Sequence, residues 1–292
     1  MLIDMTIDHE DLPRIRAGIE HIKESEDWLV IRRGAKVISK DRWIELLAKE
    51  CDLTLDRRHF DPEWAANDAR RIAFKHSEMV GTTSDLAESS VQDQVKLTDW
   101  GEISYQPERD LSYAFSKTPQ PLHTDNAWFS DPSEISFFVM DKQAVNGGEQ
   151  IIYPMSRLIE DLSIKAPGLL IDLSTIEVVI KKGDQIYNKT SNYNKTSIIK
   201  LKARPRPKIF WNYYRTDKSS PEVAAMCEAF FVFLKQQLET TSVEKVWCET
   251  GDCLSFNDLY MLHGRTAYEA RNPRDRVLLH SMWKLPVKNS LR

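Results

Sequence analysis

Two histidines and one aspartate in this chain have the residue types and the spacing of a metal site. His123 and Asp125 stand two positions apart in the stretch Pro121–Phe129, and His263 follows 140 residues after the first histidine. In an extended strand, side chains two positions apart point to the same side, so His123 and Asp125 can reach one ion while Thr124 points away. Two imidazoles and one carboxylate suit a borderline ion such as Fe(II), and they leave coordination positions open for a chelating co-substrate and dioxygen.

An ordered set of segments accompanies these residues. After His123 comes an apolar run, Ile135–Met140, then a glycine-containing turn, Asn146–Gln150, and a second apolar run, Ile151–Pro154. This pattern predicts a strand, a turn and a strand. A His-x-Asp pair alone arises often by chance, but the ordered surroundings make it a stronger signal. The segments that flank the distal histidine are Gly251–Asn257 and Arg274–His280.

Taken together, these segments resemble the Fe(II)/2-oxoglutarate-dependent dioxygenases of the taurine dioxygenase and clavaminate synthase-like group. That group shows a His-x-Asp pair, a Gly-Gly turn, a Gly-Asp-x-x-x-x-Asn segment, a distal histidine and then an arginine. The resemblance implies that His123, Asp125 and His263 bind Fe(II). It also implies that Arg276, which lies 13 residues after the distal histidine, binds the far carboxylate of 2-oxoglutarate. The planar guanidinium can donate two parallel hydrogen bonds to a carboxylate, which lysine cannot do.

Two other arginines compete for this role, since Arg271 and Arg274 also follow His263 closely. Strand alternation predicts that Arg274 and Arg276 point to the same side, so spacing alone does not separate them. We favour Arg276 because it directly precedes the apolar run Val277–Leu279.

The chain departs from the group's pattern at two positions. Gln150 stands where the group usually has Thr or Ser in the Gly-Gly turn, although its longer amide can still donate a hydrogen bond to 2-oxoglutarate. Some relatives carry a second arginine four residues after the first, and this chain has His280 there. An acidic group on the substrate must therefore be held in some other way.

Candidate substrate contacts come from residues next to the predicted ligands. Trp128 and Arg265 are placed to line a substrate pocket, although core packing of the indole and an ion pair of the guanidinium with a surface acid explain them equally well. Asn126 and His280 complete this set of candidates. Weaker candidates, named only for their proximity to the first ligand pair, are Tyr113 and Ser116.

The resemblance implies a mainly β fold with flanking helices (α+β) around a double-stranded β-helix, or jelly-roll, core. We expect one domain over residues 1–292, with an N-terminal region of a strand and helices in 1–120. The predicted core comprises 121–154 and 246–288, and the predicted insert is 155–245. Within the insert, helical periodicity predicts helices at Met155–Leu162 and Pro221–Leu238. The polar repeat at 187–196 is either a loop that closes over the substrate or an ordinary surface loop.

Composition excludes several classes of partner. The chain has 292 residues with 40 Lys+Arg against 44 Asp+Glu, and its net charge of −4 argues against nucleic acid as a partner. No apolar stretch approaches a membrane span, and residues 1–9 lack the basic start and apolar core of a signal peptide. We therefore expect no membrane partner, a small-molecule substrate and a cytoplasmic location. The four cysteines lack metal-ligand or redox spacing and are expected to be free thiols.

The activity implied by the resemblance is oxidation of an unactivated C–H bond, with Fe(II), 2-oxoglutarate and dioxygen as cofactors. Hydroxylation of a small polar metabolite, such as an amino acid or a natural-product intermediate, is the expected outcome. Desaturation, ring closure and epimerisation use the same oxidising chemistry, whereas Asp125 argues against halogenation because halogenating relatives lack that carboxylate. The competing class is a non-catalytic, cupin-like barrel that binds a metal or ligand, and a third interpretation is a structural barrel with incidental histidines. Arg276 and the Asn146–Gln150 turn argue against the binding barrel, because a simple metal binder needs no carboxylate-binding arginine behind the distal histidine. The third interpretation would leave the order of these residues as coincidence.

Overall fold

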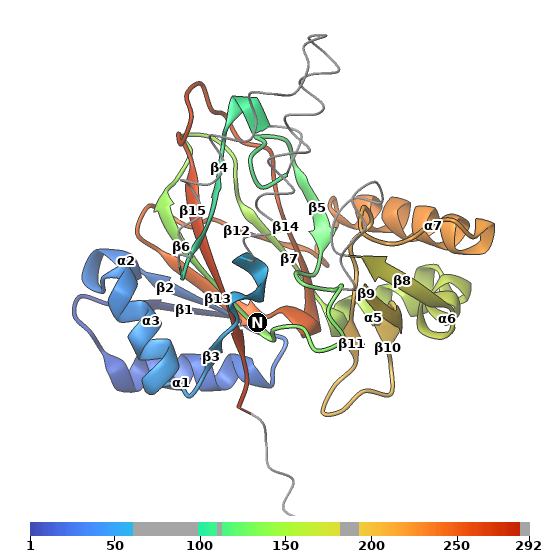
Figure 1. Ribbon diagram of the computed structural model, residues 1–292, viewed down its shortest axis with the longest axis horizontal. Coiled ribbons are helices and arrows are strands. Elements are labelled where there is room, and N and C mark those ends of the chain that lie inside the picture. The colour runs from blue at the N-terminus through green and yellow to red at the C-terminus, as the bar shows by residue number, and fades with distance from the viewer. Residues whose placement is uncertain (61–98, 110–112, 182–192, 287–292) are drawn as a thin grey trace, which may run out of the picture.

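The structure of the protein is a computed structural model that describes residues 1–60, 99–109, 113–181 and 193–286 (Figure 1). Within these ranges the chain forms two large sheets and two small two-stranded sheets, with helices on the outside. The predicted sheet-rich α+β architecture is confirmed. Residues 187–192 of the polar repeat lie outside the described residues.

The larger sheet joins strands from both ends and the middle of the chain. Among the described residues it has seven strands, in the order β1-β2-β13-β6-β15-β3, with β4 also paired to β15. The pair β1 and β2 is parallel, and the other pairs are antiparallel. Its strands are β1 (Leu2–Thr6), β2 (Trp28–Arg32), β3 (Thr54–Leu55), β4 (Gly101–Ser104), β6 (Ile135–Lys142), β13 (Cys253–Asn257) and β15 (Val277–Lys284).

The smaller of the two large sheets has four strands in the described part of the chain, in the antiparallel order β12-β7-β14-β5. It packs against the larger sheet through an apolar cluster that includes Phe138, Ile152 and Met261. The two sheets therefore form a sandwich with a shared core. Its strands are β5 (Gln120–His123), β7 (Gln150–Pro154), β12 (Glu244–Val246) and β14 (Met261–Arg265).

The larger sheet is covered on both faces, which explains its continuous apolar runs. In β6, Phe138 and Met140 face the sandwich core, while Phe137 and Val139 belong to a second cluster that contains the N-terminal helices. Alternate side chains thus enter different cores. The helices of this second cluster are α1 (Leu12–Lys23), α2 (Gly34–Val37) and α3 (Lys40–Lys49).

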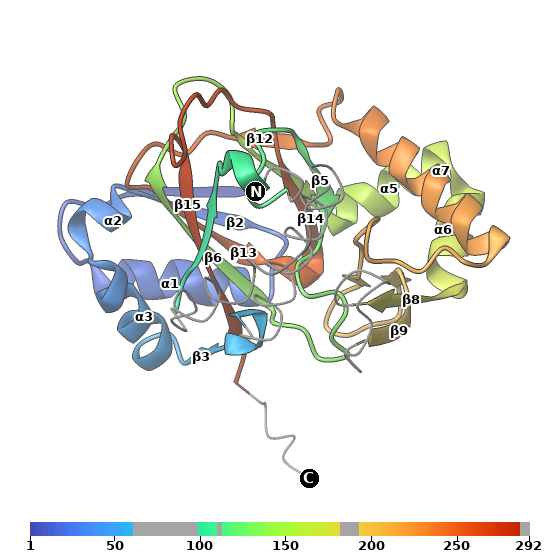
Figure 2. The ribbon, with the colours of Figure 1, turned by 45° about the horizontal axis from the view of Figure 1, so that its top comes forward.

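The remaining helices gather on the opposite side of the molecule, beyond the smaller sheet (Figure 2). The predicted helices at Met155–Leu162 and Pro221–Leu238 are confirmed as α5 and α7, and both are packed in an apolar cluster with Tyr153 and Leu262 of the smaller sheet. This region lies within the predicted insert 155–245. Its elements are α5 (Met155–Lys165), α6 (Pro167–Thr175), β8 (Glu177–Lys181), β9 (Tyr193–Ser197), β10 (Ile199–Lys200), β11 (Lys208–Ile209) and α7 (Pro221–Gln237).

The expectation of free thiols is met. All four cysteines are free, as predicted, and the structure shows that all four are buried. None of the helices in the described ranges is both long and apolar enough to cross a membrane.

Candidate functional site

Strand pairing brings the two predicted histidines together from distant parts of the sequence. His123 ends β5 and His263 lies in the middle of β14, and these residues are direct cross-strand partners in the antiparallel pair. Their ring centroids are 4.4 Å apart. One residue beyond β5, the Thr124 side chain points away and bonds to the backbone of Trp211, as strand alternation predicts. The next side chain, Asp125, therefore turns back toward the histidines.

The three side chains form a compact donor set. The Nε2 atom of His123 is 3.5 Å from Asp125 Oδ1, and the Nε2 atom of His263 is 3.4 Å from Asp125 Oδ2. One donor atom from each residue lies within 4.8 Å of the others, a separation that a single ion can bridge. The Nδ1 atom of His123 is 2.9 Å from the carbonyl oxygen of Pro121, which can only accept a hydrogen bond. Nδ1 therefore carries the proton and Nε2 is left with a lone pair for a metal.

The charges of this group stabilise one another. Burial alone raises the pKa of Asp125, but the charge of His263 and the close approach of the imidazole nitrogens of His123 and His263 lower it well below its ordinary value. For His263 burial lowers the pKa, and the Asp125 carboxylate reverses this and raises it to about 10. A divalent cation can take the place of that proton, so the electrostatics as well as the donor atoms fit a metal ion.

Arg276 occupies a second buried region, just before β15 begins. Its side chain is fully buried, and one guanidinium nitrogen, Nη2, donates a 3.1 Å hydrogen bond to the carbonyl of Gly148. Within the described residues its Nε and Nη1 atoms have no hydrogen-bond partner. Burial, and secondarily the charge of Arg265, lowers the pKa of Arg276 to about 9. A buried cation with unused donors is a ready site for an anion.

The competing arginines lie elsewhere. Arg274 has a left-handed backbone (φ 61°) and an exposed side chain that pairs with Glu102, and Arg271 is exposed as well. The expectation that strand alternation places Arg274 and Arg276 on the same side is wrong, because β15 begins only at Val277 and the chain turns at Arg274. Of the three arginines, Arg276 alone is buried.

The glycine turn positions this arginine. Gly148 has a φ of +84°, and a Cβ atom there would lie 2.7 Å from Arg276 Nε, so only glycine allows this approach. The backbone N–H groups of Gly148 and Glu149 both donate to Thr266 Oγ1 at 3.0 Å, which ties the turn to the residues after β14. The turn is followed directly by Gln150, whose buried Nε2 has no partner among the described residues.

Arg265 lies close to Arg276 rather than on the surface. Its side chain is 1% exposed, so the alternative of an ion pair with a surface acid is wrong. One guanidinium nitrogen donates to the carbonyls of Ser116 and Thr118 at 2.7 and 2.8 Å, while its Nε and Nη1 have no partner in the described chain. The guanidinium carbons of Arg265 and Arg276 lie 4.7 and 5.2 Å from the ring centroid of Tyr268.

Of the other substrate candidates, His280 lies beside Asp125. His280 is buried, stacks on Phe138 with centroids 4.2 Å apart, and has its Nε2 3.6 Å from Asp125 Oδ2. The Asn126 amide donates to Met282 Sδ at 2.8 Å. Trp128 is 8% exposed and belongs to the cluster that contains α5 and α7, which agrees with core packing. The weaker candidates contact neighbouring loops: Tyr113 donates to the hydroxyl of Tyr214, and Ser116 bonds to Thr118.

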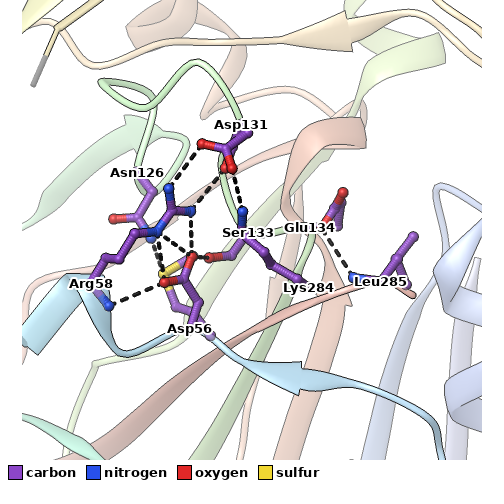
Figure 3. Close-up of polar contacts among 9 residues, drawn as sticks. Asp56, Arg58, Asn126, Asp131, Ser133, Glu134, Lys284 and Leu285 are labelled. Carbon is purple, nitrogen blue, oxygen red and sulfur yellow. Dashed lines mark hydrogen bonds and ion pairs between the residues drawn. The ribbon is translucent and has the colours of Figure 1, made fainter. Parts of the chain in front are cut away.

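An ionic network anchors the segment that follows the ligand pair (Figure 3). Arg58 donates to both oxygens of the buried Asp56 and to the side chain and carbonyl of Asp131. Ser133 donates to Asp56 at 2.7 Å, and Lys284 pairs with Asp131. The network thus joins the segment after Asp125 to the strands β3 and β15.

Sequence reasoning missed two polar residues at the metal site. Gln120, in β5, places its amide nitrogen 3.2 Å from His123 Nε2. Asp258, fully buried between β13 and β14, has Oδ1 3.1 Å from His263 Nε2 and accepts a hydrogen bond from the Asp125 backbone. Burial raises the pKa of Asp258 to about 6, against the opposing effect of His263. In the sequence Asp258 stands between Asn257 and Leu259, and no local signal there marks it as part of the site.

Comparisons with solved structures show the same fold at low sequence identity. Asparagine oxygenase, in complex with Fe(II), 2S,3S-3-hydroxyasparagine and succinate, is 12% identical with a TM-score of 0.56, over 97% of this chain and 93% of that chain. The non-heme iron oxygenase OrfP, in complex with Fe and alpha-ketoglutaric acid, is 15% identical with a TM-score of 0.53, over 94% and 83%. The PvcB protein from Pseudomonas aeruginosa is 13% identical with a TM-score of 0.56, over 97% and 84%.

At the level of sequence, no curated protein matches this chain. A family model does match: the model described as taurine catabolism dioxygenase TauD, TfdA family, aligns with residues 56–283. This range covers most of the chain and includes the three predicted metal ligands and Arg276. The chain therefore belongs to the taurine catabolism dioxygenase TauD, TfdA family, and the expected enzyme class, a 2-oxoglutarate-dependent dioxygenase, is confirmed.

Proposed function

We propose that the enzyme hydroxylates an unactivated C–H bond of a small polar metabolite, with an amino acid as the first class to test. The observation that supports this most directly is the pairing of a His-Asp-His donor set with a buried arginine that has unused donors. Two structural neighbours were determined in complex with 2S,3S-3-hydroxyasparagine and with (3S)-hydroxy-L-Arg, which supports an amino acid as substrate.

The residues have separate roles in this proposal. His123, Asp125 and His263 hold Fe(II) through their Nε2 and carboxylate oxygen atoms, and Arg276 binds the far carboxylate of 2-oxoglutarate. Gln150, at the end of the glycine turn, offers an amide hydrogen to the same co-substrate. When bound, Fe(II) with 2-oxoglutarate and dioxygen supplies an oxidant that removes hydrogen from an aliphatic carbon, with release of succinate and carbon dioxide.

The protein's own contribution is position and exclusion of water. The hydrogen bond from His123 Nδ1 to Pro121 keeps Nε2 aimed at the ion, and the Arg276 guanidinium fixes one end of the co-substrate. Both regions are almost fully buried, so the reacting carbon is held away from bulk water. His280 borders the carboxylate ligand and Asn126 follows it in sequence, and we place both beside the substrate. Arg265 and Trp128 instead support the surrounding loops and core.

The fold supports the same proposal. We take the sandwich of the two large sheets as the two halves of a double-stranded β-helix, with the metal ligands on the smaller sheet. We retain the domain division proposed from the sequence. It consists of an N-terminal region at 1–120, a core of 121–154 and 246–288, and an insert of 155–245. The four free, buried cysteines support a cytoplasmic, reducing location.

An anaerobic titration tests the proposed site. Metal-free protein receives Fe(II) and then 2-oxoglutarate, and the weak visible charge-transfer band of the chelate is recorded for the wild type, Arg276→Ala and Arg274→Ala. We expect a band that needs both ligands, is much weaker in Arg276→Ala, and is unchanged in the exposed control Arg274→Ala. Metal binding without any band would favour the cupin-like binding barrel instead.

The type of oxidation is tested next with amino acids as candidate substrates. Substrate-dependent succinate formation and a product heavier by one oxygen atom would identify hydroxylation. A product lighter by two hydrogen atoms would identify desaturation or ring closure, and a product of unchanged mass but inverted stereochemistry would identify epimerisation.

A further inference from the structure

A second carboxylate, Asp258, lies against both chain segments that supply the predicted ligands. Its Oδ2 accepts a 2.8 Å hydrogen bond from the backbone N–H of Asp125, which lies 133 residues away in sequence. Its Oδ1 is 3.1 Å from His263 Nε2. Both oxygens of this side chain are therefore directed to residues of the metal site.

The backbone around Asp258 is fixed. Its own N–H donates to the carbonyl of Glu134 at 2.7 Å, and the residue starts a single 3₁₀ turn between β13 and β14. The preceding Asn257 accepts from the N–H of Leu259 and donates to the carbonyl of Lys23 at 2.7 Å. The carboxylate is thus held in place from the larger sheet and does not depend on the metal for its position.

A fully buried carboxylate is costly unless its charge is balanced. Asp258 has an exposure of 0%, and the groups that face it from the neighbouring segments are the Asp125 N–H and the His263 ring. A neutral Asn could accept the hydrogen bond from the Asp125 backbone equally well, so that bond alone does not require an acid. The negative charge of Asp258 has a function only if a positive charge lies at His263 Nε2, which is where a bound divalent ion would lie.

We propose that Asp258 is a positioning residue of the metal centre: it fixes the Asp125 backbone against His263 and supplies a second negative charge that favours a divalent ion. This inference rests on the proposed function, because it assumes that the His123, Asp125 and His263 set binds a metal. It assigns Asp258 to the surroundings of the ion, since its two oxygens contact ligand residues. Substitution of a residue that hydrogen-bonds to a metal ligand typically lowers the metal affinity about 10–100-fold.

The test is an anaerobic titration of metal-free protein with Co(II) alone, followed by competition with a chromophoric chelator. The variants are Asp258→Asn, which keeps an acceptor for the Asp125 N–H but removes the charge, and Asp258→Ala, which removes both. The matched control is Asp252→Asn, a buried carboxylate in the same part of the chain that bonds to Arg32 and the backbone of Arg33. Each protein is first checked for native circular dichroism.

We expect Asp258→Asn to weaken Co(II) binding by about 10–100-fold and Asp258→Ala to weaken it at least as much. Asp252→Asn should lose stability and keep wild-type Co(II) affinity. Wild-type affinity in Asp258→Asn would overturn the proposal, because it would show that the hydrogen bond alone suffices. If Asp258→Ala does not fold, Asp258→Asn decides the matter by itself. A wild-type protein that binds no Co(II) would overturn the proposed function together with this inference.

Discussion

The metal site and the arginine region are both buried, but they differ in charge balance. The metal site pairs its negative charge with nearby imidazoles, whereas the arginine region has no such partner for its positive charge in the described part of the chain. At the metal site, Asp125 has two imidazoles within 3.5 Å, and Asp258 supports its backbone. In the arginine region, Arg265 and Arg276 bond only to backbone carbonyls, and within the described residues neither pairs with a carboxylate. The metal site contains groups of both charges, whereas the arginine region has positive charge and donors left over.

This difference indicates how each region responds to its ligand. The metal site exchanges one cation for another, since a divalent ion replaces the proton on His263. The arginine region gains its missing counter-charge only from a bound anion, so the co-substrate should stabilise the folded protein directly. Substitutions that remove one charge should therefore have opposite effects on the stability of the metal-free protein in the two regions.

The largest expected effect comes from Asp125→Ala. It removes a predicted ligand and leaves His263 with a single carboxylate neighbour. Metal affinity should therefore fall by more than the roughly 100-fold that is the largest loss expected on removing a residue that only contacts a ligand. Co(II) titration and succinate formation measure this loss. Asp8→Ala, at an exposed carboxylate, should leave both unchanged. Strong metal binding by Asp125→Ala would mean that the carboxylate ligand is misassigned.

A second substitution tests whether balanced carboxylates stabilise the fold in general. Burial raises the pKa of Asp56, but hydrogen bonds from Arg58 and Ser133 outweigh this and lower it to about 2. The ionised form is therefore favoured in the folded state, and its stabilisation of about 2–3 kcal/mol is present above pH 4 and lost as the pH falls toward 2.

Asp56→Asn should accordingly lose about 2–3 kcal/mol at pH 7 and show a weaker acid dependence of stability between pH 4 and 2. Urea unfolding at several pH values measures both quantities. Asp99→Asn, which removes a more exposed partner of Arg57, is the control and should cost less than about 1 kcal/mol. An unchanged acid dependence in Asp56→Asn would show that other groups control acid unfolding.

The sequence was sufficient to locate the metal site but not to identify all of its polar residues. His123 and Asp125 were found because residue type and strand alternation together specify a metal face, and the pairing with His263 follows from two compatible strands. Asp258 was not found, because its role depends on a hydrogen bond to a backbone atom 133 residues away. No local pattern encodes such a contact.

The arginine region shows a different limit. Three arginines follow His263, and the choice among them depends on where β15 starts and on the left-handed backbone at Arg274, neither of which periodicity specifies. The helices α5 and α7 were predictable from their apolar spacing. The order of strands in the larger sheet was not, because it joins segments from both ends of the chain through long-range pairing.

In the metal-free protein, Arg276→Met should change the stability in the opposite direction to Asp56→Asn. Methionine has a similar length and no charge to desolvate, so removing this unbalanced cation should stabilise the metal-free fold by about 1–2 kcal/mol. Mn(II) is then added, together with 2-oxoglutarate at 100 times the Kd of 2-oxoglutarate. The free energy of unfolding of the wild type should rise by about 2.7 kcal/mol through the co-substrate, and that of the variant should hardly change. Thermal and urea unfolding, with and without ligands, measure both effects. A destabilised metal-free Arg276→Met would show that the hydrogen bond to Gly148 outweighs the cost of the buried charge.

The smallest expected effect separates the shape of the arginine region from its charge. In Gly148→Ala, the new Cβ would lie 2.7 Å from Arg276 Nε on a backbone with φ of +84°, so we expect a loss of about 1 kcal/mol in stability and a weaker charge-transfer band at fixed 2-oxoglutarate. Gly168→Ala is the matched control, because a Cβ there meets nothing within 4 Å and the position lies inside α6. That control should be neutral or slightly stabilising, with an unchanged band. If Gly148→Ala loses stability but keeps the full band, the glycine serves the turn alone, and the position of Arg276 depends on Tyr268 and the start of β15 instead.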